Sequence, residues 1–371
     1  MPMKIPTIEE LTDPQLEIQD LPISGRYLIT GGPGSGKTTI AIRRTEFIKK
    51  DSPNSSVQTF LFTNTLNDFF GDGVRSLRVN SNVTVWAKWQ VGFLRSHEDW
   101  EFNTGDRVPK SVWPTLSRRI LDNHPLEETL YDHLIIDEAQ DYSVSDLSVM
   151  NQIADNVTVF ADENQRLRDR GIEDVDEIKE VLSIDEEDCY DLKENHRNTK
   201  EIMASAVSLA PEEIDIDPDN IMKSGQKPRI ISNQNSDKEI EYISRVIKNN
   251  RQKDIGILHL ENAVIESLYD ELSNYNDNEI NYEIMRRQRF NFSIPSPKLC
   301  TLDSAKGLEF DIVLMPRMNQ DYYYEHPKNL KRIYVGMTRA REDLLISYSG
   351  GYPTVYLSQI DPETVKRVQN Q

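Results

Sequence analysis

The amino-acid sequence predicts an α/β fold with mostly parallel sheets, organised as about two domains. One observation is the length of 371 residues, since a domain commonly holds about 100–200 residues. The other is that short apolar runs rich in β-branched residues alternate with stretches of helical spacing, which is typical of βαβ units. The expected strands are residues 27–30, 59–63, 83–86, 134–136, 158–160, 229–232, 255–259 and 312–315, and the clearest expected helices are 37–49, 237–248 and 262–272.

Two acidic segments are candidates for the boundary between the domains. Residues 173–191 are dense in carboxylates, and residues 211–228 combine acids with Pro and Gly. We place the boundary near Ser183, because strand and motif content resumes directly after it. This division predicts domains at 1–182 and 183–371, with a short helical insertion at about 95–130 in the first.

The composition excludes several classes of protein. The chain has 43 Lys and Arg against 62 Asp and Glu, and its net charge of −19 argues against a protein that holds phosphates through overall positive charge. A nucleic-acid site stays open, because such a site depends on local basic residues. Two cysteines, Cys189 and Cys300, cannot form a disulfide framework or a four-ligand zinc site alone. No apolar run approaches the length of about 20 residues that spans a bilayer, so we expect a cytoplasmic protein with no membrane partner.

Residues 31–38 match the phosphate-loop pattern G-x-x-x-x-G-K-[ST] at every fixed position, between an apolar strand and a helical stretch. Glycines permit a tight turn whose backbone N–H groups receive phosphate oxygens. Lys37 would neutralise the terminal phosphates, and Thr38 would hold Mg²⁺. An ordinary glycine-rich turn is the alternative, which the strand–loop–helix context disfavours. The predicted nucleotide-binding residues of this segment are Gly31, Gly32, Pro33, Gly34, Ser35, Gly36, Lys37, Thr38 and Thr39.

A second segment, residues 134–141, is an apolar strand that ends in adjacent acids and reads Leu-Ile-Ile-Asp-Glu-Ala-Gln-Asp. Because side chains alternate across a strand, Asp137 and Glu138 can serve different partners. We expect Asp137 to hold Mg²⁺ and Glu138 to polarise an attacking water. A solvated acidic strand end is the alternative for this segment taken alone, since acids are plentiful in the chain.

The phosphate loop and the DEAQD string at residues 137–141 begin a series of motifs that resembles, in order, the UvrD/Rep/PcrA-like superfamily 1 DNA helicases. The later members of the series are residues 158–165, 192–198, 301–310 and 333–341. The resemblance covers nearly the whole chain. It implies two RecA-like P-loop NTPase domains with an ATP site in the cleft between them, and ATP and Mg²⁺ as cofactors.

The resemblance also implies roles for residues outside the first two motifs. Gln165 would sense the γ-phosphate, and Arg197 and Arg339 would stabilise charge on the γ-phosphoryl oxygens in the transition state. Each arginine, in isolation, would be read as a solvated or salt-bridged side chain. The further ATP contacts that the resemblance implies are Gln15, His196, Gly307 and Glu309.

A surface for a single nucleic-acid strand is a further implication. The rings of Phe62 and Trp86 are expected to stack on bases, as in sequence-independent binders. Where the family has aromatic residues after the glutamine of its third motif, this chain has Arg166 and Arg168, whose planes can stack on bases or pair with phosphates. The full set of expected contacts is Phe62, Thr63, Asn64, Thr84, Trp86, Arg166, Arg168 and Ser304.

The chain is shorter between motifs than UvrD-type enzymes. The intervals from Trp86 to Asp137 and from Arg197 to Thr301 leave no room for two large inserted subdomains, which indicates a near-minimal pair of motor domains. We therefore expect an ATP hydrolase that translocates on single-stranded DNA, with 3′-to-5′ movement implied by the resemblance alone. One alternative is a motor or regulatory subunit that works only with a protein partner such as a nuclease, in DNA repair or phage defence. An RNA-directed enzyme is a third reading.

Overall fold

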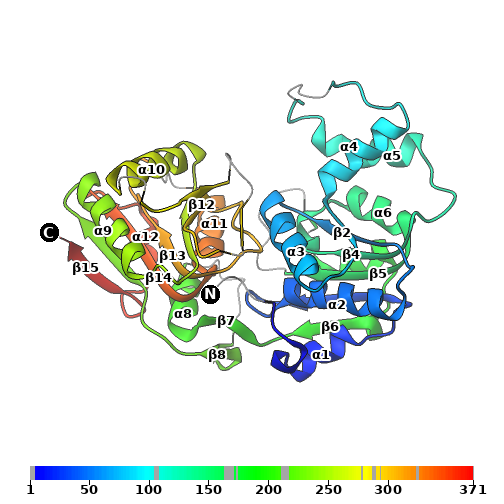
Figure 1. Cartoon of the computed structure of the whole chain (residues 1–371), viewed down its shortest axis with the longest axis horizontal. Helices are drawn as coiled ribbons and strands as arrows, with labels where there is room; N and C mark the ends of the chain where they lie inside the picture. Colours follow the sequence, from blue (N-terminus) through cyan, green and yellow to red (C-terminus); the bar gives the residue numbers. More distant parts are fainter. Residues whose placement is uncertain are drawn as a thin grey trace. The chain divides into compact units, whose positions relative to one another are not determined.

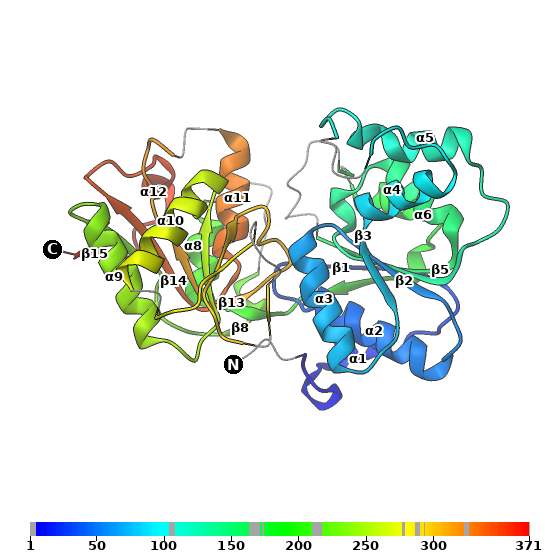
Figure 2. The ribbon, with the colours of Figure 1, turned by 45° about the horizontal axis from the view of Figure 1, so that its top comes forward.

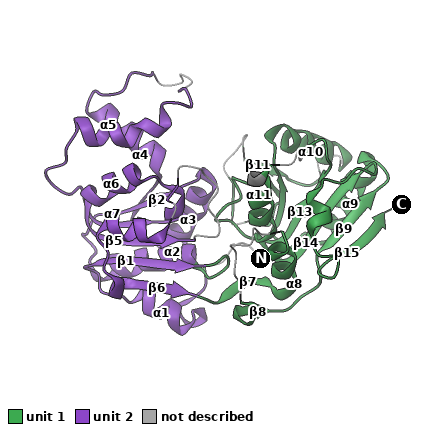
Figure 3. Cartoon of the chain, turned by 180° about the vertical axis from the view of Figure 1, so that it is seen from behind, with its two compact units in different colours: residues 1–5, 32–36, 193–371 green, residues 6–31, 37–192 purple. Residues whose placement is uncertain are grey.

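The computed structural model of the chain describes residues 5–103, 108–162, 171–172, 174–209, 217–276, 279–285, 290–292, 294–322 and 326–370. The chain divides into two compact units (Figure 3). The N-terminal unit comprises residues 6–31 and 37–192, and the C-terminal unit comprises residues 193–371 together with 1–5 and 32–36. Each unit is built on its own parallel sheet, which confirms the α/β fold class that the sequence predicts.

The sheet of the N-terminal unit has six strands in the order β3-β2-β4-β5-β1-β6, and each neighbouring pair is parallel. Its central strands are almost continuously buried, because helices cover both faces of a parallel sheet. The strands are β1 (Arg26–Gly31), β2 (Val57–Leu61), β3 (Asn82–Val85), β4 (Tyr131–Ile136), β5 (Ala154–Ala161) and β6 (Cys189–Leu192).

Helices lie on both faces of this sheet (Figures 1 and 2). One layer holds α1 (Asp13–Gln19), α2 (Lys37–Asp51) and α3 (Asn64–Ser76). The other holds α4 (Trp86–Ser96), α5 (Leu116–Asn123), α6 (Val144–Ile153) and α7 (Val175–Leu182). This second layer packs on the sheet through one apolar cluster, to which Phe60, Leu134 and Val159 contribute from the strands.

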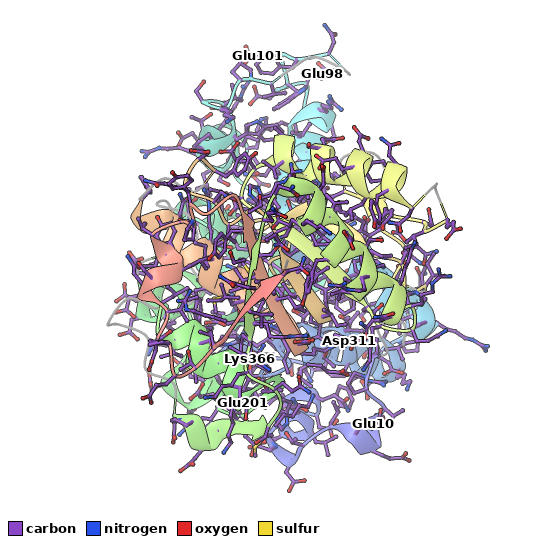
Figure 4. The ribbon with its side chains drawn as sticks, turned by 90° about the vertical axis from the view of Figure 1, so that its left-hand side faces the viewer. Glu10, Glu98, Glu101, Glu201, Asp311 and Lys366 are labelled. Atoms are coloured by element: carbon purple, nitrogen blue, oxygen red, sulfur yellow. The ribbon has the colours of Figure 1, made fainter. Side chains whose placement is uncertain are left out.

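The segment expected as a helical insertion, about 95–130, contains the end of α4, a 3₁₀ turn at Trp113–Thr115 and α5. Asp99 ties the segment together, because its carboxylate accepts from Arg119 Nε at 2.9 Å and lies 3.0 Å from His124 Nε2. The Arg119 guanidinium, followed by His124, holds the pKa of Asp99 well below its ordinary value. Glu98 and Glu101 lie at the outer end of the segment (Figure 4).

The main sheet of the C-terminal unit has seven strands in the order β11-β12-β10-β13-β14-β9-β15, and each neighbouring pair is parallel. The strands are β9 (Arg229–Asn233), β10 (Ile255–His259), β11 (Glu283–Ile284), β12 (Lys298–Thr301), β13 (Phe310–Met315), β14 (Ala340–Ser349) and β15 (Lys366–Asn370). A separate parallel pair joins β7 (Asn195–Thr199) to β8 (Ile221–Lys223).

The helices of the C-terminal unit are α8 (Lys200–Val207), α9 (Ser236–Asn249), α10 (Asn262–Tyr275), α11 (Pro327–Met337) and α12 (Tyr356–Gln359). α9 and α10 pack side by side (Figure 1). Their apolar stripes, which include Ile243 and Leu268, meet the sheet residues Ile257 and Leu314 in one core cluster. This cluster holds β12 and β13 in place, and the motif at residues 301–310 lies between these two strands.

The division between the units differs from the boundary that the sequence analysis placed before Ser183. Residues 183–192 lie in the N-terminal unit because β6 pairs with β1, with Cys189 opposite Leu28 and Leu192 opposite Gly31. β6 is an edge strand with only one fully buried residue, Leu192, so it carries little of the apolar pattern that marks a strand.

Candidate functional site

The phosphate-loop motif lies between the end of β1 and the start of α2. Gly34 and Gly36 have φ of +80° and +93°, conformations that glycine adopts without strain. Ser35 Oγ donates to Gly32 O at 3.0 Å, which closes the turn. Lys37 is 9% exposed, and its ammonium donates to the carbonyl of Gly31 and, at 3.2 Å, to Asp162. The loop therefore has a tight turn of the kind that phosphate-binding loops use, and the positively charged Lys37 follows it directly.

Gly34 leaves no room for a side chain. A Cβ there would lie 2.3 Å from Asn195 Oδ1 and 2.8 Å from Arg197 Cβ. The Asn195 oxygen cannot retreat, because it accepts from the backbone N–H groups of Arg197 and Asn198 at 2.9 Å each. The Gly34 carbonyl in turn accepts from His196 N at 3.0 Å.

We expect Gly34→Ala to lower the melting temperature of the protein by about 4 °C or more, measured by differential scanning calorimetry. The left-handed backbone alone costs an alanine about 1–2 kcal/mol, before the collision with Asn195 is counted. Gly32→Ala is the matched control, because nothing lies within 4 Å of its Cβ position. Equal melting temperatures for the two variants would contradict this account of the loop.

Asp137 follows directly on β4, and Thr38 Oγ1 donates to its Oδ2 at 2.8 Å. Burial and the adjacent charge of Glu138 raise the pKa of Asp137 above its ordinary value. A dication would reverse this effect, since it favours the ionised carboxylate. A hydroxyl and a carboxylate are the hard oxygen ligands that Mg²⁺ prefers. The pair therefore fits a magnesium ion whose other ligands are phosphate oxygens and water.

Glu138 is held by the turn that follows β4. It has φ of +57°, which is uncommon outside glycine, and its amide donates to Asp137 Oδ1 at 3.0 Å. Gln140 Nε2 donates to Glu138 Oε2 at 2.6 Å, while Gln140 Oε1 accepts from Asp162 N at 2.9 Å. A Cβ at Gly171 would lie 2.2 Å from Gln140 O, so the backbone packs directly on this turn. The sequence analysis assigned no role to Gln140 or Asp162, although both lie in motifs that it singled out.

Two of the predicted ATP residues, Arg197 and Glu309, form an ion pair in the C-terminal unit. Arg197 Nε donates to Glu309 Oε2 at 2.7 Å, and Arg341 Nη1 donates to Glu309 Oε1 at 3.2 Å. Burial alone would raise the pKa of Glu309, but the charges of Arg197 and Arg341 outweigh it and lower the pKa to about 2. Glu309 is therefore ionised at neutral pH. Arg341, which the sequence analysis gave no role, shares its charge between Glu309 and Asp311, 2.7 Å away.

Arg339 is 1% exposed, and its guanidinium is fixed by oxygens of its own unit. Nε donates to Val335 O at 2.9 Å, Nη1 to Leu308 O at 3.3 Å and Nη2 to Thr338 Oγ1 at 3.1 Å. These bonds come from the helix before Arg339 and from the loop before β13. The side chain thus has one defined orientation, which a group that acts on a transition state needs.

Of the other residues expected to contact ATP, Gln15 and His196 have polar partners close by in the sequence. Gln15 is buried in the first turn of α1, where its Oε1 accepts from Thr12 N at 3.2 Å. His196 Nε2 lies 2.9 Å from Glu194 Oε2. Gly307 has φ of +78°, so its backbone conformation favours glycine. Thr39 lies in the first turn of α2, directly after Thr38.

Several of the residues expected at the nucleic-acid surface are at least partly exposed. Phe62 is half-buried and meets Tyr142 edge-on, with ring centroids 5.4 Å apart. Thr63 caps α3 by accepting from Leu66 N at 3.1 Å, and Asn64 is exposed. The half-buried side chains are Thr63, Thr84 and Ser304, and the Ser304 hydroxyl accepts from Thr301 Oγ1 at 2.8 Å.

Trp86 does not fit its expected role as a base-stacking residue. It is 4% exposed, and its Nε1 donates to Asp146 Oδ1 at 2.8 Å. Its ring stacks on Trp89 with centroids 4.9 Å apart and meets Phe60 edge-on. The residue starts α4 instead of ending a strand, which turns the indole into the apolar layer under the sheet. We therefore assign Trp86 to the core of the N-terminal unit.

Three predicted site residues, Gln165, Arg166 and Arg168, lie outside the described residues. In the part of the chain that the structure describes, no helix is long and apolar enough to cross a membrane. Nor does that part contain a group of three or more His, Cys, Asp or Glu side chains arranged for a metal ion. A magnesium ion held by Thr38 and Asp137 would take its other ligands from phosphate oxygens and water.

The fold and these motifs define an α/β protein of two parallel sheets that carries a phosphate-loop motif. Two family models, each described as a UvrD-like helicase C-terminal domain, match residues 190–293 and 299–347. Residues 190–293 and 299–347 are therefore similar to the C-terminal domains of UvrD-like helicases, which supports the resemblance that the order of the motifs indicated.

Among solved structures, the chain is similar to the C-terminal domain of a possible DNA helicase from Lactobacillus plantarum WCFS1. The two share 17% sequence identity over 47% of this chain and 99% of that one, with a TM-score of 0.38. The comparison with curated proteins found no match.

Proposed function

We propose that the protein is an ATP-dependent translocase that hydrolyses ATP on single-stranded DNA and moves 3′ to 5′. The observation that supports ATP hydrolysis most directly is the hydrogen bond between Thr38 and Asp137, 2.8 Å long, at the end of a glycine loop that leads into Lys37. This combination supplies a phosphate cradle, a cation for the terminal phosphates and oxygen ligands for Mg²⁺. The family match of residues 190–347 supports a helicase-type role.

Each residue of the proposed ATP site has a separate role. The loop amides and Lys37 bind the phosphates, Thr38 and Asp137 hold Mg²⁺, and Glu138 polarises the attacking water. The bound ion would neutralise charge on the phosphate oxygens. Arg197 and Arg339 act on the γ-phosphoryl oxygens, where charge spreads in the transition state.

Steady-state ATP turnover with and without a single-stranded oligo-dT tests the proposal. We expect turnover that depends on Mg²⁺, is stimulated by the oligonucleotide, and is abolished by Lys37→Ala. Stimulation should fall steeply as salt rises, because a chain of net charge −19 can hold a strand only through a local basic track. Turnover that is absent, or that Lys37→Ala leaves unchanged, would refute ATP hydrolysis.

Two further measurements test the direction of movement and the choice between DNA and RNA. Duplexes with a 3′ or a 5′ single-stranded tail report the direction of movement and any strand separation. An oligoribonucleotide that stimulates as well as DNA would favour the RNA-directed alternative.

The second candidate function is a motor or regulatory subunit that works only with a protein partner, such as a nuclease. The short interval between α4 and β4 supports this candidate, because its described residues form a 3₁₀ turn and one short helix, α5, instead of a large subdomain. The net charge of −19 also suits a basic protein partner. ATP turnover that stays silent with DNA and appears when a co-purifying protein is added would favour this role over autonomous translocation.

A further inference from the structure

Asn198 connects two segments of the C-terminal unit that each carry one of the proposed catalytic arginines. The side chain is 0% exposed, and its Nδ2 donates to Thr338 O at 2.9 Å and to Ala340 O at 2.6 Å. These two carbonyls belong to the residues on either side of Arg339, so one amide group fixes the backbone on both sides of that arginine. The orientation of the amide follows from chemistry, because a carbonyl oxygen can only accept.

The same asparagine is linked to the backbone of Arg197 through the side chain of Asn195. Asn195 Oδ1 accepts from the amides of Arg197 and Asn198 at 2.9 Å each, and Asn195 Nδ2 donates to Asn198 Oδ1 at 3.0 Å. Arg197 therefore sits inside a turn that the side chains of Asn195 and Asn198 close from both ends. A shift of this turn moves the arginine that lies within it.

Burial makes these bonds hard to replace. The amide of Asn198 and the two carbonyls that it joins are shielded from water, so neither carbonyl gains a solvent partner if the amide is lost. Loss of the donor must instead be relieved by movement of the segments, which carry Arg197 on one side and Arg339 on the other. The sequence analysis included Asn198 in a motif but gave it no role.

We propose that Asn198 is a positioning residue for ATP hydrolysis, which holds Arg197 and Arg339 in one arrangement so that both guanidinium groups act on the γ-phosphoryl group together. The inference rests on the proposed function, since it assigns a task to the two arginines. It goes beyond that function because it makes their placement depend on a third residue. Asn198 acts through the arginines and not by contact with ATP.

Two substitutions test this role. Asn198→Asp keeps the shape of the side chain but replaces the donor with oxygens that the two carbonyls repel. Asn198→Ser is milder, since its short side chain cannot span both carbonyls, and it serves if the first variant does not fold. We expect either variant to lower kcat by about 10²-fold, the scale of a misplacement of about 1 Å. The dissociation constant of a fluorescent ATP analogue should stay close to that of the wild type.

Asn276→Asp is the matched control in the same unit. Asn276 is equally buried, and its Nδ2 donates to Leu272 O at 2.9 Å and to Tyr282 Oη at 2.7 Å, away from both arginines. This variant should lower the melting temperature about as much as the Asn198 variants but leave kcat near the wild-type value. Equal losses of kcat at the two asparagines would overturn the inference, because the effect would then be a general loss of stability.

A double-mutant cycle with Arg339→Lys separates positioning from an independent defect. If Asn198 acts through the two arginines, Asn198→Ser should slow the Arg339→Lys variant by much less than it slows the wild type, because only the placement of Arg197 is then left to lose. Losses that multiply would overturn the inference while the proposed function stands. A wild-type protein without turnover that depends on Lys37 would overturn the proposed function and this inference with it.

Discussion

Glu138→Gln should slow ATP hydrolysis by about 10²–10⁴-fold while ATP still binds with nearly unchanged affinity. Glutamine fills the same space and can still accept a hydrogen bond from Gln140, so the turn after β4 should keep its form. What the variant lacks is a charged carboxylate that can take a proton from the attacking water. Single-turnover hydrolysis, combined with titration of a fluorescent ATP analogue, measures the two quantities separately.

The control for this variant is Glu187→Gln, which removes one charge from an exposed position in the same unit. It should hydrolyse ATP at the wild-type rate, so a loss at Glu138 alone cannot come from the change in net charge. If Glu138→Gln kept its full rate, the residue would have no part in activating water. If it lost ATP binding together with hydrolysis, its role would be to support the turn.

The strands that the sequence predicts well are the apolar ones in the centres of the two sheets. β10 (Ile255–His259) has the expected bounds, and β1 and β4 extend theirs by a few residues. The central strand β14 (Ala340–Ser349), whose residues 344–346 are apolar and buried, also escaped prediction, whereas two others that escaped it, β7 (Asn195–Thr199) and β15 (Lys366–Asn370), are polar. β7 and β15 are stabilised by backbone pairing, as in the parallel ladder of β15 on β9. Backbone pairing produces no periodic hydrophobic pattern in the sequence from which a strand could be predicted.

The site residues also differ in how far the sequence alone could identify them. Lys37, Thr38 and Asp137 could be singled out because each occupies a defined position in a recognisable sequence motif. Asp162 could not, because its ion pair with Lys37 joins residues far apart in the chain whose proximity depends on strand order. Trp86 shows the opposite case: the sequence placed it at the end of a strand and the resemblance implied a base contact, whereas α4 begins at that residue and turns the ring into the core.

Arg339→Lys should lower ATP turnover by about 10³-fold or more, within the range that an arginine contributes to phosphoryl transfer. The two side chains carry the same charge, but lysine has a single ammonium group in place of a planar fork. In this structure the fork joins Val335 O, Leu308 O and Thr338 Oγ1, an arrangement that one nitrogen cannot reproduce. The substitution therefore keeps the positive charge at position 339 but removes the fixed orientation of the charged group. Pre-steady-state hydrolysis at saturating ATP measures the loss.

Arg341→Lys is the matched control, two residues further along the chain, in β14. Arg341 is bound to the carboxylates of Glu309 and Asp311, and lysine can retain part of that ion pairing. We expect this variant to lose some stability but far less turnover than Arg339→Lys. An equal loss of turnover at both positions would mean that the whole cationic segment matters, and not the guanidinium of Arg339. A normal rate for Arg339→Lys would remove this arginine from the proposed transition state, because orientation is what the substitution takes away.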